Sequence, residues 1–439
     1  MNPADRLNLL AENNPFASCS ARDPRECAFP DVPGINRHVH EGLLRLASGK
    51  ATAPAEGLAA LVLGEVGSGK THLMHRLYEI SWNSRAPYFF SYVQPVQDPQ
   101  RAYGYLLRRI VADLSRPMKP GTKATPWHHL VGAVLGFAVC TRFVTPKTAR
   151  FRKALQSDPL NIFRARLKPE VMHRIESAAL DILRRDFPKP FARAVLGYRY
   201  PGRRVALLDW LSGLELDAGD AKTAGLAPRP SLPPEASEQV ARDMLENIGK
   251  LLSKYGKPML VCMDRLENLE TEGQIHAFGR VVEFMVDTAQ ALLPAAFCRW
   301  ELWEEVMAHK LNQHVSSRLA GNRFELHGAT ERQGLIIIRK RLARALGEEI
   351  GEDLLPLDRD SLLQALGPGY TSPRNVINLA NRQLQRAVEE RRSREAEPPP
   401  GTVEGETEVL DKAACVEQAF EAACANTGQR LDVLREALF

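Results

Sequence analysis

Long apolar runs and closely paired cysteines are both missing from this chain of 439 residues. The longest apolar run, Leu130 to Cys140, covers about half of the length of roughly 20 residues that a membrane-spanning helix needs. The seven cysteines include no CxxC spacing, which leaves no readable zinc framework and favours reduced thiols. Residues 1–16 mix charges and lack an apolar stretch before a cleavage site, so no signal peptide is expected. These absences predict a soluble, cytoplasmic protein without membrane contact.

The charge of the chain is ordinary in amount but uneven in distribution. A charged fraction of 25% and a hydrophobic fraction of 44% exclude a mainly disordered chain, and the length suggests about three domains. The formal net charge is +5, yet residues 101–210 contain 22 Lys and Arg against 7 Asp and Glu, a net of +15. The other 329 residues therefore carry −10. One quarter of the chain is strongly basic, which points to an anionic partner.

Short apolar runs alternate with helical patterns in two parts of the chain. Strands are predicted at residues 58–63, 87–93, 258–263, 291–298 and 324–326. Helical spacing follows at residues 73–80, 102–114, 240–255 and 278–289. This alternation predicts an α/β fold with a parallel sheet covered on both faces. Helices at 331–346, 360–366 and 374–390 predict a helical lid, and Thr330 with Gln333 forms a capping box at its start.

The strongest motif is a phosphate-binding loop. Residues 64–71 read GEVGSGKT, after a predicted strand and before a helix, which is the context that this motif requires. Its glycines allow successive backbone N–H groups to surround an anion. Lys70 is expected to reach the β- and γ-phosphates, and Thr71 to bind Mg²⁺. The predicted nucleotide-binding residues are Gly64, Glu65, Val66, Gly67, Ser68, Gly69, Lys70, Thr71 and His72.

A second acidic motif follows the predicted strand at 258–263. Asp264 stands at the end of this strand, where a carboxylate can bind Mg²⁺ together with Thr71. Glu267 is the candidate for polarising the attacking water, because hydrolysis needs a positioned carboxylate. The alternative is that Glu267 lies on a solvated helix face.

With these motifs the chain resembles the AAA+ and STAND-type P-loop ATPases, and its layout is most similar to the origin-recognition branch. The resemblance covers about residues 30–115 and 236–392. It implies a three-layer parallel P-loop sheet with a helical lid, ATP and Mg²⁺ as ligands, ATPase activity, and a homo-oligomer. The segment at 31–36 resembles the one that packs on adenine in these families. The family's acidic pair is adjacent, whereas Arg265 follows Asp264 here, which leaves the hydrolytic base open.

The resemblance also implies roles for three arginines. Arg299, after the strand at 291–298, would read the γ-phosphate. Arg318 would be an arginine finger supplied to a neighbouring subunit. Arg374, within the sequence Ser-Pro-Arg, would be the arginine of the lid. The alternative for all three is a surface ion pair, which contributes little to stability.

The predicted organisation has five parts. They are residues 1–114 (N-terminal segment and first part of the ATPase domain), 115–235 (basic helical insertion), 236–327 (second part of the ATPase domain), 328–394 (helical lid) and 395–439 (acidic, proline-rich linker and C-terminal helical tail). Residues 219–236, rich in Pro, Gly and Ala, are also predicted to be a linker.

The basic insertion mixes cationic and aromatic residues. Its prominent basic residues are Arg108, Arg109, Arg142, Lys147, Arg150, Arg152, Lys153, Arg164, Arg166, Lys168, Arg184, Arg185, Arg203 and Arg204. The aromatic residues between them are Trp127, Phe143, Phe151, Phe163, Tyr198 and Tyr200. Cations that neutralise phosphates and aromatics that stack on bases favour DNA as a partner of residues 101–210, without sequence specificity. The alternative is a solvated face, or one that pairs with the acidic remainder of the chain.

We therefore predict an ATP-hydrolysing AAA+/STAND-like protein that acts on DNA or a DNA-bound protein complex. By analogy with relatives that carry such insertions, bacterial defence against phage or mobile DNA is the favoured setting. The alternative is a slowly hydrolysing switch or scaffold, or a transposition-type regulator, that binds a partner effector protein. A kinase-like phosphotransferase is less favoured, because it has no use for the three arginines.

His128 and His129 lack further ligands at metal-binding spacing, so a core or surface role is expected.

Overall fold

The computed structural model describes residues 3–18, 23–83 and 85–396. The predicted linker and helical tail at 395–439 lie outside this range except for their first two residues. Residues up to Val388 form one compact unit, and the chain from Glu389 belongs to a second. Within the described ranges, no helix is both long and apolar enough to cross a membrane.

A parallel sheet of five strands forms the centre of the first unit, in the order β2-β3-β4-β1-β5. The strands are β1 (Ala60–Gly64), β2 (Phe89–Val93), β3 (Met259–Met263), β4 (Leu292–Cys298) and β5 (Arg323–Leu326). Every residue of β1 to β4 is buried, as expected for a parallel sheet that is covered on both faces. All five strands were predicted, and the α/β fold class is confirmed.

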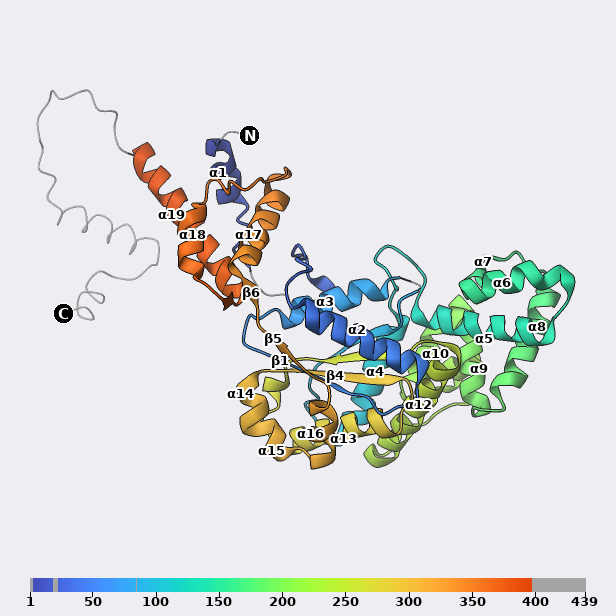
Figure 1. Ribbon diagram of the computed structural model, residues 1–439. Helices are drawn as coiled ribbons and strands as arrows, with labels where there is room; N and C mark the ends of the chain where they lie inside the picture. The colour runs from blue at the N-terminus through green and yellow to red at the C-terminus, as the bar shows by residue number, and fades with distance from the viewer. Residues whose placement is uncertain (1–2, 19–22, 84, 397–439) are drawn as a thin grey trace, which may run out of the picture. The chain divides into compact units, whose positions relative to one another are not determined.

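Helices cover both faces of the sheet, as Figure 1 shows. Helices α2 (Arg37–Thr52) and α3 (Lys70–Ser81) pack with Val62 on one face. Leu61 and Leu63 point to the other face, because side chains alternate along a strand. That face is covered by helices α4 (Ala102–Ser115), α12 (Pro234–Tyr255) and α13 (Glu272–Asp287). The three-layer architecture predicted from the sequence is confirmed.

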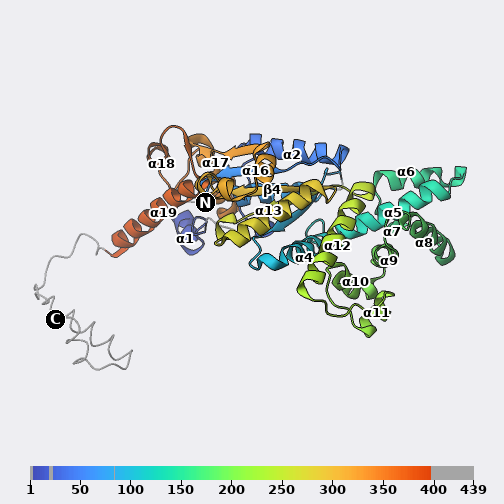
Figure 2. The ribbon, with the colours of Figure 1, turned by 90° about the horizontal axis from the view of Figure 1, so that it is seen from below.

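The insertion between α4 and α12 is helical, as predicted (Figure 2). Its helices are α5 (Pro126–Arg142), α6 (Ala149–Ser157), α7 (Asn161–Arg164), α8 (Pro169–Leu183), α9 (Lys189–Gly197), α10 (Arg204–Leu211) and α11 (Ala218–Ala224). Helix α5 contains the longest apolar run, and Trp127, Leu130 and Leu135 are fully buried. These residues belong to the same hydrophobic cluster as Leu61 and Leu63 of β1. The insertion therefore shares one hydrophobic core with β1 and with the helices that cover this face of the sheet.

The predicted linker at 219–236 is wrong, because this stretch is ordered by local capping. Asp217 accepts a hydrogen bond from the backbone of Asp220 and starts α11. Gly225 ends the helix in the left-handed conformation at φ 71°. Leu216 and Arg229 then exchange two backbone hydrogen bonds of 2.8 and 2.9 Å, which hold the chain after α11 against the chain before it.

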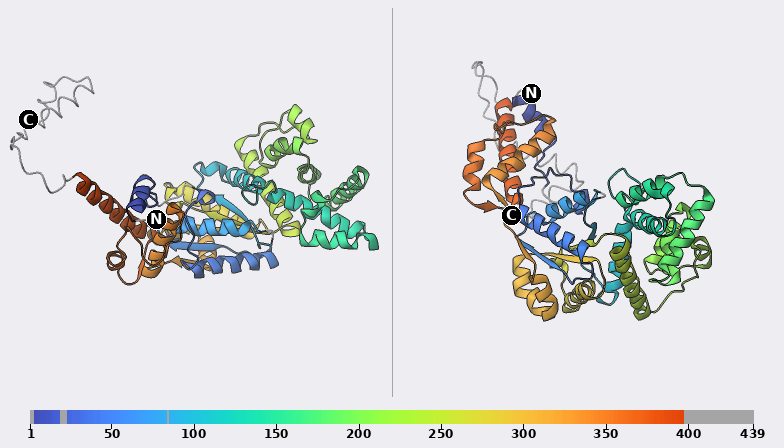
Figure 3. Two further views of the ribbon diagram at one scale, coloured as in Figure 1. Left: turned by 90° about the horizontal axis from the view of Figure 1, so that it is seen from above. Right: turned by 45° about the vertical axis from the view of Figure 1, so that its right-hand side comes forward.

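The lid forms a second helical group, drawn in orange to red in Figure 3. Helices α17 (Glu331–Leu346), α18 (Arg359–Leu366) and α19 (Pro373–Ala396) carry its core, and α1 (Pro3–Glu12) packs on α17. Two short antiparallel strands, β6 (Ala329–Thr330) and β7 (Tyr370–Thr371), pair with each other just before α17 and α19 begin. The predicted capping box of Thr330 and Gln333 is present at the start of α17.

Candidate nucleotide-binding site and basic surface

The loop between β1 and α3 has a backbone that only glycine adopts easily. Gly67 and Gly69 have φ angles of 83° and 102°, in the left-handed region where other residues are strained. Gly64 is needed for space, because a Cβ there would lie 2.6 Å from Ser68 Oγ and 2.9 Å from Leu326 Cβ. The loop thus has the form of an anion cradle at the N-terminus of α3.

Lys70 is folded back over this loop. Its Nζ donates hydrogen bonds to the carbonyl oxygens of Gly64, at 2.6 Å, and Glu65, at 3.0 Å. Burial lowers the pKa of Lys70, although the nearby carboxylates of Asp264 and Glu267 oppose this shift. The site therefore holds a cation whose solvation is poor and whose charge an anion would stabilise.

A cavity of about 280 Å³ opens above this loop at the carboxyl ends of the strands. This is the edge at which parallel α/β sheets bind ligands. Of the nine predicted nucleotide-binding residues, the cavity is lined by Val66, Gly67, Gly69, Lys70, Thr71 and His72. Gly64, Glu65 and Ser68 belong to the same loop but do not line the cavity, and Ser68 N–H donates to Glu65 O at 3.2 Å within the loop.

The acidic motif reaches the same cavity. Asp264 directly follows β3, is buried, and accepts a hydrogen bond from the hydroxyl of Tyr92 at 3.3 Å. Burial and the neighbouring Glu267 raise the pKa of Asp264, while Lys70 opposes the shift. Arg265 adopts the left-handed conformation at φ 59° and turns the chain into a short 3₁₀ helix, Leu266–Asn268. Glu267 lies on this turn with an exposed side chain that lines the cavity.

Two of the three predicted arginines also lie at the cavity. Arg299 follows β4, and Arg374 lies in the first turn of α19, where its N–H donates to Gly67 O at 3.5 Å. A Cβ on Gly67 would lie 2.6 Å from the Cβ of Arg374, so the lid helix begins directly on the phosphate-binding loop. Within the described residues, the buried Nε atoms of Arg299 and Arg374 have no hydrogen-bond partner. Such orphaned donors suit an anionic ligand.

Arg318 is placed elsewhere. It lies on α16 (Gln313–Ala320), where its guanidinium is 3.8 Å from Asp287 and 3.4 Å from the carbonyl oxygen of Gly57. Gly57 precedes β1, so this arginine is near the amino ends of the strands and does not line the cavity. A role for Arg318 in a neighbouring subunit's site stays a prediction.

Several residues of the cavity were not predicted. Arg76 of α3 and Arg341 of α17 are both buried, and the guanidinium of Arg341 lies 4.1 Å from the ring centre of Phe29. The charged lining consists of Lys70, Arg76, Arg265, Arg299, Arg341 and Arg374 against Asp264 and Glu267. Among its Lys, Arg, Asp and Glu side chains the cavity therefore has an excess of four positive charges. The arginines carry no motif, so nothing in the local sequence marks them among the other basic residues of their helices.

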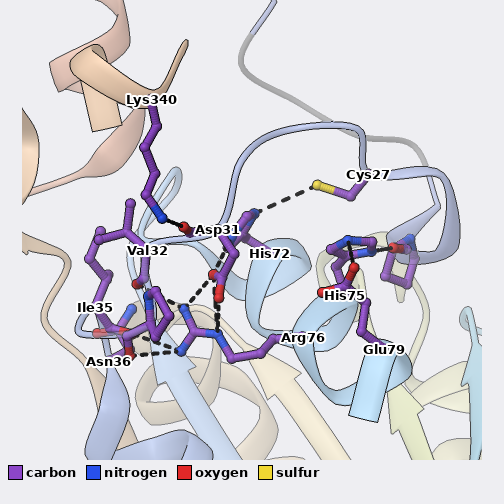
Figure 4. Close-up of polar contacts among 12 residues, drawn as sticks. Cys27, Asp31, Val32, Ile35, Asn36, His72, His75, Arg76, Glu79 and Lys340 are labelled. Carbon is purple, nitrogen blue, oxygen red and sulfur yellow. Dashed lines mark hydrogen bonds and ion pairs between the residues drawn. The ribbon is translucent and has the colours of Figure 1, made fainter. Parts of the chain in front are cut away.

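The segment at 31–36 contributes to the cavity wall through Val32, Ile35 and Asn36. Asn36 Nδ2 also donates to Ser68 O at 3.1 Å, which ties this segment to the phosphate-binding loop. The carboxylate of Asp31 accepts hydrogen bonds from Arg76 (Figure 4). Lys340 of the lid donates to the carbonyl oxygen of Asp31 at 2.5 Å. The segment thus contacts both α3 and the lid.

The basic insertion exposes most of its cations but few of its aromatics. Within the part of the chain that the structure describes, no ion pair involves the exposed side chains of Arg142, Arg150, Lys153, Arg166, Lys168, Arg184 and Arg185. The side chain of Lys147 is outside that part. Trp127 and Tyr198 are 0% and 3% exposed, so the expectation that they stack on bases is wrong. The ring of Tyr200 is exposed, but the guanidinium groups of Arg199 and Arg203 already lie 4.8 and 4.9 Å from its centre.

The two neighbouring histidines have structural roles. His128 closes the capping box of α5 with Thr125. His129 is buried, and burial lowers its pKa to about 4. Among residues 3–18, 23–83 and 85–396, no group of His, Cys, Asp and Glu side chains could hold a metal ion.

No protein-family model and no curated protein matches the chain. Among solved structures it is similar to Cdc6p from Pyrobaculum aerophilum, with 12% sequence identity and a TM-score of 0.39. The match covers 84% of this chain and 65% of Cdc6p, just under two thirds of that protein. The chain is also similar to the ORC2 protein of Aeropyrum pernix, solved as ADPNP–ADP complexes, with 14% identity and a TM-score of 0.39. That match covers 95% of this chain and 83% of ORC2.

Proposed function

We propose that this chain binds ATP with Mg²⁺ and hydrolyses it, as an AAA+/STAND-like ATPase. The observation that carries the proposal is the cavity itself, whose lining has an excess of four positive charges beside a glycine cradle. A triphosphate supplies the matching negative charge, and the N–H groups at the start of α3 point toward it. The apolar residues Val32, Ile35 and Ile337 of the same lining offer a surface for the base.

The residues present fit both ligands. The orphaned Nε donors of Arg299 and Arg374 need an acceptor, which phosphate oxygens provide. Mg²⁺ would be held by the hydroxyl of Thr71 and the carboxylate of Asp264, and when bound it would neutralise phosphate charge. Lys70 stabilises negative charge on the transferred phosphoryl group.

Glu267 is the proposed group that orients the attacking water. Changing Glu267 to Gln keeps its size and removes its charge, so ATP turnover should fall by about 10²-fold or more while ATP affinity stays similar. Steady-state turnover and equilibrium ATP binding measure these two quantities separately. Glu270→Gln, an exposed residue one turn further on, is the matched control and should retain full turnover. Equal turnover in the two variants would exclude Glu267 as the base.

A slowly hydrolysing switch is the second candidate function, because Glu267 is exposed and separated from Asp264 by the turn at Arg265. An exposed carboxylate is less well positioned than a buried one to fix a water molecule. Tight ATP binding by the wild-type chain without measurable turnover would favour this function, in which a bound effector protein reads the nucleotide state.

DNA is the proposed partner of residues 101–210, and defence against phage or mobile DNA the proposed setting. Support comes from the exposed cations of the insertion that form no ion pair with any described residue, since each phosphate contact releases a counterion. Assembly into a homo-oligomer is part of the same proposal, because Arg318 lies outside its own cavity and is 45% exposed. In such an assembly Arg318 could reach a neighbour's nucleotide.

A salt titration of DNA binding tests the basic surface. Replacing Arg150, Lys153 and Arg166 together by Ala should weaken binding and reduce the slope of log K against log salt by about 2–3. The control replaces three exposed basic residues outside the insertion, Arg45, Lys310 and Arg382, by Ala. Fluorescence anisotropy with a labelled duplex measures both slopes. If the two triple variants lose the same slope, net charge rather than the insertion governs binding.

A further inference from the structure

Three side chains meet beside the cavity: a thiol that can act as a nucleophile, an imidazole that can act as its base, and a carboxylate that orients the imidazole. Cys27 Sγ lies 3.6 Å from His72 Nδ1, and His72 Nε2 lies 2.8 Å from Asp31 Oδ1, as Figure 4 shows. His72 comes from α3, whereas Cys27 and Asp31 come from the segment that precedes α2. A thiol, an imidazole and a carboxylate in this order form the arrangement that activates cysteine nucleophiles on unrelated folds.

The surroundings hold the imidazole in place. Arg76 donates to both carboxylate oxygens of Asp31, at 2.7 and 3.1 Å, which keeps this carboxylate charged and fixed. Nε2 of His72 is hydrogen-bonded to this fixed carboxylate, so Nδ1 of the same ring is held facing the sulfur of Cys27. An imidazole in this orientation can take the thiol proton through Nδ1 while its Nε2–H donates to Asp31.

The same thiol lies in the wall of the proposed nucleotide site. Cys27 and His72 line the cavity together with Phe29 and Val32, whose side chains form part of its apolar surface. The proposed ATPase chemistry uses the loop, Asp264, Glu267 and the arginines, and gives this thiol no task. A ligand that fills the cavity would cover it.

We propose that Cys27 is a reactive thiol that small hydroperoxides oxidise in the nucleotide-free protein, and that bound nucleotide shields it. The shielding rests on the proposed nucleotide site, whereas the reactivity does not. His72 Nδ1 takes the thiol proton as the sulfur attacks the hydroxyl oxygen of the hydroperoxide, so that an S–O bond forms while the O–O bond breaks. Sulfur is oxidised to a sulfenic acid, and the peroxide is reduced to an alkoxide that takes a proton from His72 and leaves as the alcohol.

The test compares two cysteines of the full chain by their rates of alkylation with iodoacetamide. Trypsin releases Cys27 and Cys140 on separate peptides, residues 26–37 and 124–142, that each contain one cysteine. Cys140 is the more exposed of the two, so exposure alone would make it react faster. We expect Cys27 to react about tenfold faster than Cys140 at pH 7, because His72 lies within reach of its thiol proton and can act as its base. A rate for Cys27 at or below that of Cys140 overturns the reactivity, and this comparison needs no variant.

A variant then tests the imidazole. His72→Gln can still donate to Asp31 but cannot take the thiol proton, so the Cys27 rate should fall about tenfold. The Cys140 rate in the same sample should stay unchanged, which reports that the fold is intact. An unchanged Cys27 rate would show that His72 does not activate the thiol.

The oxidation step is tested in the wild type by adding peroxide before iodoacetamide. Peroxide should protect Cys27 from alkylation, and dithiothreitol should restore the alkylation. No protection by peroxide would contradict the oxidation step.

Shielding is measured with ATP and Mg²⁺ in the same assay. Saturating ATP should slow Cys27 alkylation at least tenfold and leave Cys140 unaffected, and calorimetry on the same sample shows whether ATP binds. ATP that binds without slowing Cys27 overturns the shielding and leaves the proposed ATPase intact. Fast alkylation of Cys27 without any ATP binding leaves the reactive thiol intact and overturns the proposed nucleotide site.

Discussion

Replacing Lys70 by Ala should abolish measurable ATP turnover and weaken ATP binding by about 10- to 100-fold. A hydrogen bond to a charged group contributes about 1.5–3 kcal/mol, and tenfold in affinity corresponds to about 1.4 kcal/mol. Turnover should fall further, by about 10²–10³-fold, because the lysine acts where charge develops during phosphoryl transfer. Equilibrium binding of ATP and steady-state turnover measure the two losses.

Two comparisons separate this loss from misfolding. Burial lowers the pKa of Lys70 in the folded chain, so its charge opposes folding at neutral pH, where the unfolded chain also carries it. The variant should therefore unfold within about 4 °C of the wild type. Lys153→Ala removes an exposed lysine of the insertion and should leave turnover without DNA unchanged. Wild-type ATP affinity in Lys70→Ala would show that the cavity does not bind the phosphates.

Gly67→Ala should reduce ATP affinity more than about tenfold and lower the free energy of unfolding by about 1–2 kcal/mol. The stability loss follows from the backbone, since a left-handed φ costs a residue with a Cβ about that much. The affinity loss follows from the lid, because the new Cβ would lie 2.6 Å from the Cβ of Arg374. Either the loop or the first turn of α19 must move, and both line the cavity.

The matched control is Gly49→Ala in helix α2, where no atom lies within 4 Å of an added Cβ. Alanine there should stabilise the helix by about 0.5–1 kcal/mol and leave ATP binding unchanged. Chemical denaturation and calorimetric titration measure both quantities. Normal ATP affinity in Gly67→Ala would mean that the start of the lid helix does not rest on the loop when ATP is bound.

The sequence contains most of what determines the sheet, because each of the four strands β1 to β4 is a short and fully buried run. It also contains the phosphate-binding loop, whose glycines are required by local backbone geometry at Gly67 and Gly69. The capping box at Thr330 was predictable for the same reason, since its partners are three residues apart. Features that depend on neighbours along the chain were therefore accessible to prediction.

Features that depend on contacts between residues far apart in the sequence could not be predicted. Arg76 and Arg341 look like solvent-facing cations of amphipathic helices, and their burial depends on segments that are far away in the chain. Trp127 was expected to meet DNA because basic residues surround it, yet α5 packs its apolar side chains inward. Asp217 and Gly225 show how composition misleads, because two caps order a stretch that resembles a linker.

The hydrophobic cluster that runs from β1 through α4 into α5 determines which segments of this protein can be deleted without exposing its core. Leu61, Leu107 and Trp127 belong to one cluster, so the insertion is no detachable module. Removing it would uncover α4 and α12, which α5 contacts, and leave a large apolar surface in water. The proposed DNA contacts are therefore better removed by changing exposed charges than by excising the insertion. The same continuous packing means that a displacement of the insertion would be transmitted to β1 and β3, the strands that precede Lys70 and Asp264.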